Sequence, residues 1–130
     1  MIVVAAAIIR QDQDILLTKR PANVHLANLW EFPGGKVEAN ESLEAALRRE
    51  LREELGIEAN VLDEFYSTTH HYPHKSVELH FFNCAIASGE LRAIEVAEFR
   101  WVKARDLHAY EFPEADRELV DRLARPHSSL

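Results

Sequence analysis

The sequence is short of cysteine and of positive charge, and each shortage excludes a class of protein. Cys84 is the only cysteine among 130 residues, so no intrachain disulfide can form and a reducing compartment, the cytoplasm, is expected. The chain has 15 lysines and arginines against 22 aspartates and glutamates, a net charge of −7, and no basic run. Nucleic acid polymers and anionic membranes bind to basic surfaces, so we expect neither as a partner.

Long apolar runs are missing as well. The apolar stretch 1–9 has no basic residue before it, and Arg10 and Asp12 end it, so it is too short to cross a bilayer and unlike a signal peptide. We interpret it as a first strand. The 130 residues contain no repeat, linker or low-complexity segment, which predicts a single domain, 1–130, whose residues 126–130 form a flexible tail.

Strand-like and helix-like segments alternate along this domain. The β-branched and aromatic composition of strands occurs in Ile2–Ile9, Ile15–Thr18, Val61–Thr69, Val77–Ala87 and Arg100–Val102. A helix is expected to begin at Asn40 or Ser42 and to end at Gly56. A second, amphipathic helix is expected over Glu114–Leu123. Strands before, between and after two helices predict an α/β fold, an α/β/α sandwich with a mixed central sheet.

Three carboxylates of the first helix lie close to its apolar face. At about 100° per residue, Glu50 and Glu54 border the leucine seam, and Glu53 lies beside them. The basic residues Arg48 and Arg52 take the far side, whereas a solvated helix would show the reverse arrangement. Crowded carboxylates next to a core repel one another and need a cation. Hard divalent ions such as Mg²⁺ take oxygen ligands and keep bound water and phosphate, so this helix predicts a metal site.

The same segment carries a motif with fixed gaps. Its pattern is Gly, five residues, Glu, seven residues, Arg-Glu, an apolar residue, any residue, Glu-Glu, any residue, Gly and an apolar residue. The motif residues are Gly35, Glu41, Arg49, Glu50, Leu51, Glu53, Glu54, Gly56 and Ile57. This pattern is the Nudix box, and the chain resembles the Nudix hydrolase family. Stretches at 17–20, 27–28, 31–36 and 112–116 resemble its MutT-like subgroup of nucleoside triphosphate pyrophosphohydrolases.

The resemblance implies a metal-dependent hydrolysis. The implied metal ligands are Glu50, Glu53, Glu54, the main-chain carbonyl of Gly34 and, from outside the box, Glu95. The implied ion is Mg²⁺, with Mn²⁺ as a possible substitute. Water attacks the β-phosphorus and releases a nucleoside monophosphate and pyrophosphate. Glu50 is the favoured general base with Glu53 second, and Arg49 orients the carboxylates.

The substrate is expected to meet two further groups of residues. Arg20 and Lys36 are the candidates for contact with phosphate, since arginine binds it bidentately. The alternative for Arg20 is an ion pair with a surface acid. Asn28, Phe32 and Asp116 are the candidates for contact with the base.

Asp116 differs from the pattern of the subgroup. MutT-like enzymes that prefer oxidised guanine have asparagine here, whose amide both donates and accepts, whereas an ionised aspartate only accepts. Asp116 therefore favours a base with an exocyclic amino group, such as the N4 amine of cytosine or the N6 amine of adenine. In the alternative interpretation Asp116 points to solvent and Asn28 recognises the base. Both 8-oxo-dGTP and CTP or dCTP are candidate substrates, and nucleotide-pool sanitation is the expected role.

Two other functions are kept as alternatives. A hydrolase of the same fold can act on another nucleoside diphosphate compound, such as a nucleotide sugar or dinucleotide. A non-catalytic Nudix module can bind nucleotide without hydrolysing it, although such modules usually lose box carboxylates that this chain keeps. The expected partner is a small nucleotide substrate, and the chain is expected to be a monomer or a homodimer.

Overall fold

The computed structural model describes residues 1–24 and 26–125, so the tail predicted at 126–130 lies outside the described residues. The strands are β1 (Ile2–Gln11), β2 (Asp14–Lys19), β3 (Trp30–Glu31), β4 (Gly34–Lys36), β5 (Glu58–Tyr72), β6 (Lys75–Ser88) and β7 (Glu98–Lys103). The helices are α1 (Leu43–Leu55) and α2 (Arg117–Ala124), and two 3₁₀ turns, η1 (Ala104–Ala109) and η2 (Glu114–Asp116), precede α2. Every strand expected from the sequence is present, and β5 and β6 extend beyond their predicted bounds.

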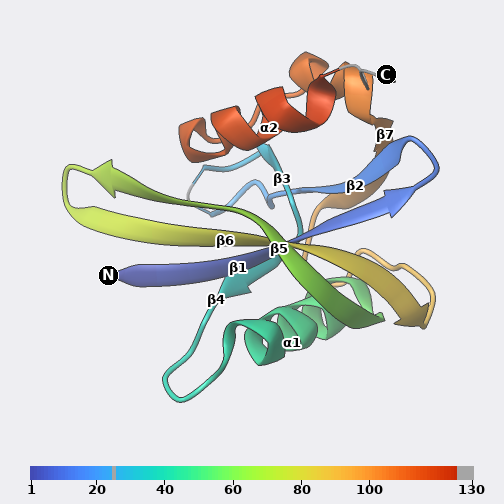
Figure 1. The fold of residues 1–130 in the computed structure, drawn as a ribbon, viewed down its shortest axis with the longest axis horizontal. Coiled ribbons are helices and arrows are strands. Elements are labelled where there is room, and N and C mark those ends of the chain that lie inside the picture. The colour runs from blue at the N-terminus through green and yellow to red at the C-terminus, as the bar shows by residue number, and fades with distance from the viewer. Residues whose placement is uncertain (25, 126–130) are drawn as a thin grey trace.

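A mixed seven-stranded sheet forms the centre of the molecule. Its main path is β3-β2-β1-β6-β5, while β4 pairs with β1 and β7 pairs with β2. The strands β1 and β6 run parallel over eight residue pairs, and the other pairings are antiparallel. In Figure 1, α1 lies below the sheet and α2 above it. The structure thus confirms the predicted α/β/α sandwich.

Strand β1 explains how one sheet supports two cores. Its residues 5–9 are all buried, because the side chains alternate between two covered faces. Ala5, Ala7 and Ile9 pack in the cluster under α1, where the leucine seam of α1 also lies. Ala6 and Ile8 belong to the opposite cluster, together with apolar residues of α2. The sheet therefore holds α1 and α2 on opposite faces at fixed positions.

The ends of α1 follow the predicted capping chemistry. Of the two candidates for the start, Ser42 is the cap, because its Oγ accepts a hydrogen bond from the Ala45 N–H at 3.0 Å. At the other end, Gly56 has φ +71°, and its N–H donates to the Arg52 carbonyl. The acidic part of α1 is consequently fixed in phase relative to the sheet.

The predicted start of the second helix was wrong. The sequence pattern placed the helix over Glu114–Leu123, whereas the structure has the short turn η2 first and α2 only from Arg117. The Asp116 N–H donates to the Pro113 carbonyl three residues back, as in a 3₁₀ turn. The backbone of Asp116 (φ −92°, ψ −3°) separates η2 from α2, and this geometry turns Asp116 towards the sheet.

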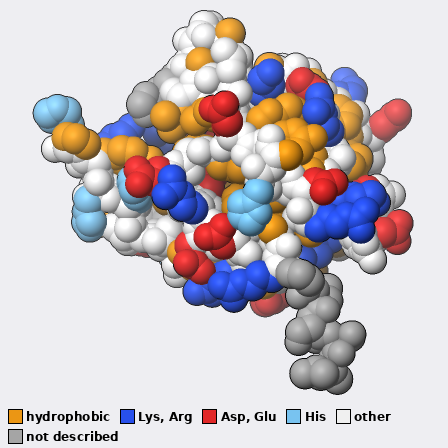
Figure 2. All heavy atoms as spheres, turned by 90° about the horizontal axis from the view of Figure 1, so that it is seen from above, with side chains coloured by type: hydrophobic (Ala, Val, Ile, Leu, Met, Phe, Trp, Pro, Cys, Tyr) orange, Lys and Arg blue, Asp and Glu red, His pale blue; other side chains and the backbone are white. Residues whose placement is uncertain are grey.

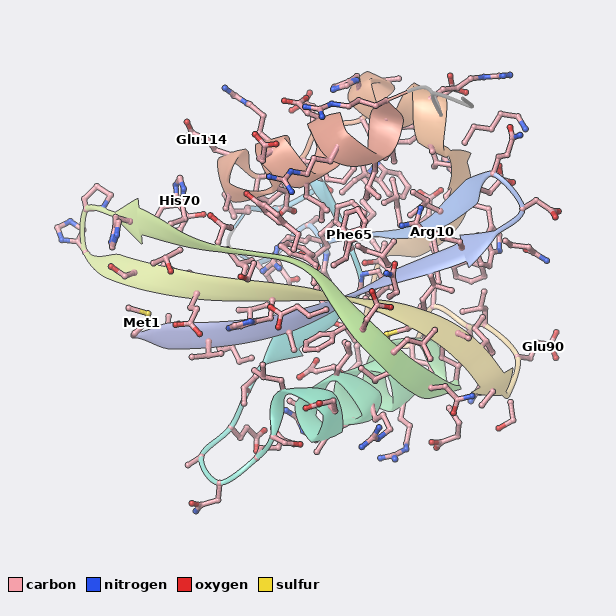
Figure 3. All side chains as sticks on the ribbon, in the orientation of Figure 1. Met1, Arg10, Phe65, His70, Glu90 and Glu114 are labelled. Atoms are coloured by element: carbon pink, nitrogen blue, oxygen red, sulfur yellow. The ribbon has the colours of Figure 1, made fainter. Side chains whose placement is uncertain are left out.

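The β5–β6 hairpin and the exposed face of α2 form the outer surfaces near the site. In Figure 3, His70 near the hairpin end and Glu114 before α2 lie at the same end of the molecule. Figure 2 shows basic and acidic side chains interspersed with apolar patches over the α2 side. Within 1–24 and 26–125, no helix is long and apolar enough to cross a lipid bilayer.

Candidate active site

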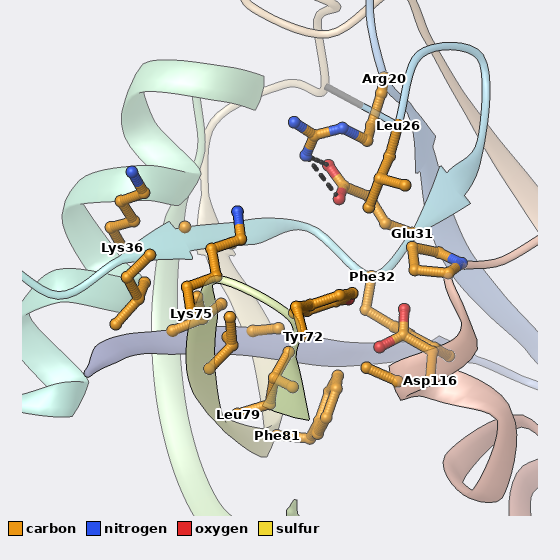
Figure 4. Close-up of a pocket in the computed structure, with 18 residues that line it drawn as sticks. Arg20, Leu26, Glu31, Phe32, Lys36, Tyr72, Lys75, Leu79, Phe81 and Asp116 are labelled. Atoms are coloured by element: carbon orange, nitrogen blue, oxygen red, sulfur yellow. Dashed lines mark hydrogen bonds and ion pairs between the residues drawn. The ribbon is translucent and has the colours of Figure 1, made fainter. Parts of the chain in front are cut away.

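A cavity of about 210 Å³ opens between the sheet and the segments that precede α2. Its apolar wall comes from one face of β1 and β6, including Val4, Ala6, Leu79 and Phe81. Charged side chains line the rest: Arg20, Glu31, Lys36, Lys75 and Asp116. Figure 4 shows Lys36 and Lys75 towards the α1 end and Asp116 at the opposite end. An elongated ligand with a charged end and an aromatic end matches this distribution.

The buried end of the cavity is aromatic and holds one carboxyl group. Phe32 is 3% exposed, stacks on Phe112 with ring centroids 5.6 Å apart, and meets Phe81 edge-on. Asp116 is 5% exposed, and no side-chain hydrogen bond is recorded for it from the described part of the chain. Burial raises the pKa of the Asp116 carboxyl to about 7, and the negative charge of Glu31 adds to the increase. The alternative in which Asp116 points to solvent is therefore wrong.

Arg20 lines the cavity and forms an ion pair there. Its guanidinium donates to both carboxylate oxygens of Glu31, at 3.1 Å and 3.5 Å. The alternative that the sequence left open, an ion pair with an acid, is thus realised. The acid is not on the remote surface, however, because Glu31 lines the same cavity. Arg20 therefore faces the cavity with its charge partly offset.

Asn28 lies elsewhere. It lines a second hollow, together with Trp30, Tyr110 and neighbouring residues, and is not among the residues that line the main cavity. Its positive φ of 65° places it in the loop between β2 and β3. Of the three predicted base contacts, the structure brings together Phe32 and Asp116 only.

The acids of α1 meet the glycine turn behind the cavity. The Gly34 N–H donates to Glu54 Oε1 at 3.3 Å, and a Cβ on Gly35 would collide with the Glu50 carboxylate. Burial raises the pKa of Glu54 to about 8, and the charges of Glu31 and Glu50 add to the increase. Burial also raises the pKa of Glu50, against the opposing effect of Arg49. Burial thus disfavours the ionised form of both carboxyl groups, as expected from their place beside the apolar face of α1.

Arg49 connects the glycine turn to the acidic face of α1. Its Nε donates to Glu41 at 2.8 Å, and one terminal nitrogen donates to Glu50 at 2.8 Å and to Glu53 at 3.3 Å. The other terminal nitrogen donates to the Lys36 carbonyl at 3.0 Å. Hydrogen bonds from Arg49 and from the Glu38 N–H lower the pKa of Glu41 to about 2. The guanidinium thus fixes the orientation of two box carboxylates.

Glu95 reaches the acidic cluster from the segment before β7. The N–H groups of Ile94 and Glu95 both donate to the Glu54 carbonyl, at 3.0 Å and 3.3 Å. The charge of Glu95 contributes to the raised pKa of both Glu50 and Glu54. The fold therefore places the charge of an acid from outside the box close enough to act on Glu50 and Glu54.

The donor set of this cluster fits a hard divalent cation. Carboxylate oxygens crowd together with raised pKa values, and a cation would offset their mutual repulsion. As arranged here, no group of three or more His, Cys, Asp or Glu side chains in 1–24 and 26–125 has the geometry to hold a metal ion. Arg49 is bonded to two of the carboxylates.

Sequence reasoning assigned no role to Glu31, although the residue was part of a quoted motif stretch. Its side chain lies between the aromatic end and the acidic end of the site, and burial raises its pKa despite the Arg20 ion pair. The available signal was an acid between Trp30 and Phe32, both of which are buried. A carboxylate flanked by buried aromatics needs a partner, and that requirement marks it as a site residue.

Comparisons with known proteins agree with this geometry. The family model for the NUDIX domain matches residues 4–122. The protein named CTP pyrophosphohydrolase from Escherichia coli (strain K12) is 43% identical, over 97% of this chain and 97% of its own. The 8-oxo-dGTP diphosphatase of the same organism is 35% identical, over 94% and 95%. The crystal structure of the MutT protein from Methanosarcina mazei Go1 superposes with a TM-score of 0.84 at 28% identity, covering 98% of this chain and 96% of that one.

Proposed function

The chain belongs to the NUDIX domain family, and we propose that it hydrolyses a nucleoside triphosphate to the nucleoside monophosphate and pyrophosphate. The names of its relatives, a CTP pyrophosphohydrolase and an 8-oxo-dGTP diphosphatase, supply the substrate class and the role in nucleotide-pool sanitation. One observation in the structure supports the proposal most strongly. The cavity has an aromatic end with a buried carboxyl group, and Gly34 and Gly35, which line it, lie against the Glu54 and Glu50 carboxylates of α1.

Divalent metal is used generally in this family, and we propose Mg²⁺, with Mn²⁺ as substitute. Its ligands would be Glu50, Glu53, Glu54 and Glu95 with the Gly34 carbonyl. When bound, the ion supplies neutralisation of phosphate charge and acidifies the attacking water. We propose Glu50, whose carboxylate Arg49 orients through a 2.8 Å hydrogen bond, as the general base that would accept the proton of the attacking water. Arg49 holds Glu50 and Glu53 in place through its hydrogen bonds.

The phosphate contacts are proposed for Arg20 and Lys36. Both line the cavity, and Figure 4 shows them well separated, Lys36 beside α1 and Arg20 beside Glu31. Lys36 lies at the end of β4, next to the acids of α1, which suits contact with the phosphates at the point of cleavage. Arg20 lies nearer to the aromatic end, which suits contact with a phosphate closer to the sugar.

The base is proposed to stack against Phe32 and to meet Asp116. An ionised Asp116 accepts a hydrogen bond from the N4 amino group of cytosine, whereas a protonated Asp116 also donates one to a carbonyl such as guanine O6. With a pKa of about 7, both forms are present near neutral pH. We therefore propose that cytidine triphosphates and 8-oxo-dGTP are both substrates. Asn28 is proposed to act only indirectly, since it lies in the second hollow.

A nucleotide panel tests this function. The wild-type protein is incubated with Mg²⁺ and CTP, dCTP, 8-oxo-dGTP, a nucleotide sugar or a dinucleotide. Pyrophosphate, orthophosphate and nucleoside monophosphate are measured, because the nucleotide sugar and the dinucleotide yield the monophosphate without free pyrophosphate. We expect pyrophosphate from the triphosphates and its loss in Glu53→Gln. Turnover of the nucleotide sugar or dinucleotide alone would favour the second hydrolase, and binding without any turnover would favour the non-catalytic module. Fractionation of cells tests the proposed cytoplasmic location, which rests on the single cysteine.

A further inference from the structure

Glu31 is placed to act on base recognition without lying in the acidic cluster. It occupies the end of β3, and Arg20 donates to both of its carboxylate oxygens. Arg20 and Glu31 line the same cavity as Asp116. In Figure 4 the ion pair lies on one side of the cavity and the Asp116 carboxylate on another. Three charged groups from three separate segments therefore surround the proposed position of the base.

The electrostatics distinguish Glu31 from the other acids of the site. Glu31 is the charged group that raises the pKa of Asp116 in addition to burial. It is also the first of the charges that raise the pKa of Glu54, after burial. The ion pair with Arg20 opposes the burial of Glu31 itself and favours its ionised form. A negative charge held in this place disfavours a second negative charge on Asp116.

We propose that Glu31 is a positioning residue that sets base selectivity: it holds Arg20 through their ion pair and places a negative charge in the cavity that the Asp116 carboxyl also lines. This inference rests on the proposed function of the site. A protonated carboxyl group offers one donor and one acceptor, as an asparagine amide does. A protonated Asp116 can therefore donate a hydrogen bond to a base carbonyl oxygen, which an ionised Asp116 would repel. Burial remains the larger cause of the raised Asp116 pKa, so loss of the Glu31 charge increases the ionised, acceptor-only fraction of Asp116 and shifts the preference towards a base with an amino group.

The other groups around Asp116 do not take over this role. Tyr72 of β5 is a neutral phenol, and the charges of Asp116 and Glu114 raise its pKa further, after burial. Glu114, on the same turn as Asp116, is exposed. Arg20 acts on Glu31 through their ion pair. Glu31 is thus the charge from a different element that bears on Asp116.

The direct test is a pH titration of Asp116 monitored by its carboxyl ¹³C NMR signal. This measurement does not depend on enzymatic turnover. The wild-type signal should titrate near pH 7, and Glu31→Gln should lower its midpoint by about one unit. The matched control is Glu58→Gln, which removes the acid of another Arg–Glu ion pair, formed with Arg52 on the outer side of α1. The control should leave the midpoint unchanged. An unchanged midpoint in Glu31→Gln would overturn the proposal.

Two further measurements keep the test decisive. If Glu31→Gln fails to fold, Glu31→Met, which also removes the charge, is titrated in its place and should lower the Asp116 midpoint as well. An unchanged midpoint in that variant would likewise overturn the proposal. For the selectivity, the ratio of kcat/KM for CTP over 8-oxo-dGTP near pH 7 should rise about tenfold in Glu31→Gln, one pKa unit being a factor of ten. Glu31→Asp, which keeps the charge, should restore the wild-type ratio.

Failure of this inference is distinguishable from failure of the proposed function. If the wild-type protein hydrolyses no triphosphate, the function is wrong, but the NMR titration still reports whether Glu31 acts on Asp116. If pyrophosphate is released and the titration midpoints of wild type and Glu31→Gln coincide, the function stands and the role of Glu31 is wrong.

Discussion

The two ends of the cavity are built in different ways. At the α1 end, the contacts of Arg49 with Lys36, Glu41, Glu50 and Glu53 all lie within 18 residues of sequence. At the aromatic end, Arg20, Glu31, Phe32 and Asp116 come from β2, the β3 region and the turn before α2. The first set is local and depends on helix geometry, whereas the second depends on the whole sheet. The chemistry of the enzyme and its choice of base can therefore change separately.

The largest effect is expected from the acidic end. Glu50→Gln keeps the size of the side chain but removes the proposed base, so kcat should fall by about 10²–10⁴-fold for every triphosphate. Quenched assays of pyrophosphate release measure this loss. Glu58→Gln, outside the site, is the control and should keep wild-type rates. Wild-type turnover in Glu50→Gln would move the role of general base to Glu53.

Arg49 should matter nearly as much, although it is proposed to touch no substrate. Arg49→Met removes the hydrogen bonds to Glu41, Glu50 and Glu53 but keeps the aliphatic packing. Misplacement of catalytic groups by about 1 Å can cost about 10²-fold in rate, and we expect a loss of that order in kcat. A matched change, Arg52→Met, removes only the exposed pair with Glu58 and should leave kcat unchanged. Equal losses in both variants would point to general destabilisation of α1.

What could be predicted from the sequence also differs between the α1 end and the aromatic end of the cavity. The spacing of Glu50, Glu53 and Glu54 along a helix fixes their common face, because helix geometry is local. The burial of Asp116 could not be derived, since it depends on a 3₁₀ turn that replaces the predicted helix start. Asn28 was grouped with the base contacts, but the fold placed it in another hollow. Glu31 gained its role only through Arg20 and Asp116, which are distant in sequence.

At the aromatic end, the expected change is in selectivity rather than rate. Asp116→Asn provides a donor and an acceptor at every pH, so the ratio of kcat/KM for CTP over 8-oxo-dGTP should lose its pH dependence. In the wild-type protein the ratio should rise by about tenfold as the pH passes upward through 7, because Asp116 loses its proton. The same slope in Asp116→Asn and wild type would show that Asp116 does not read the base.

The smallest effect concerns stability. The pKa of Asp116 is raised from 3.8 to about 7, so the folded state binds the proton more tightly than the unfolded state. The resulting stabilisation is complete below about pH 4 and is lost as the pH rises through 7. The free energy of unfolding of Asp116→Asn, relative to that of the wild type, should therefore rise by about 1–3 kcal/mol between acid and mildly alkaline pH. Urea unfolding at both pH values measures the difference, and a constant difference would contradict the burial of an unpaired carboxyl.

The claim that catalysis and base selectivity depend on separate ends of the cavity is tested most directly by the ratio of kcat/KM for CTP to kcat/KM for 8-oxo-dGTP. The values of kcat/KM for CTP and for 8-oxo-dGTP are measured in wild type and in Glu50→Gln at one pH. Because Glu50 acts on the attacking water and not on the base, both values should fall by the same factor, and their ratio should stay within about twofold of the wild-type ratio. A ratio that changes by about tenfold or more would contradict the account, because the two ends of the cavity would then act as one unit.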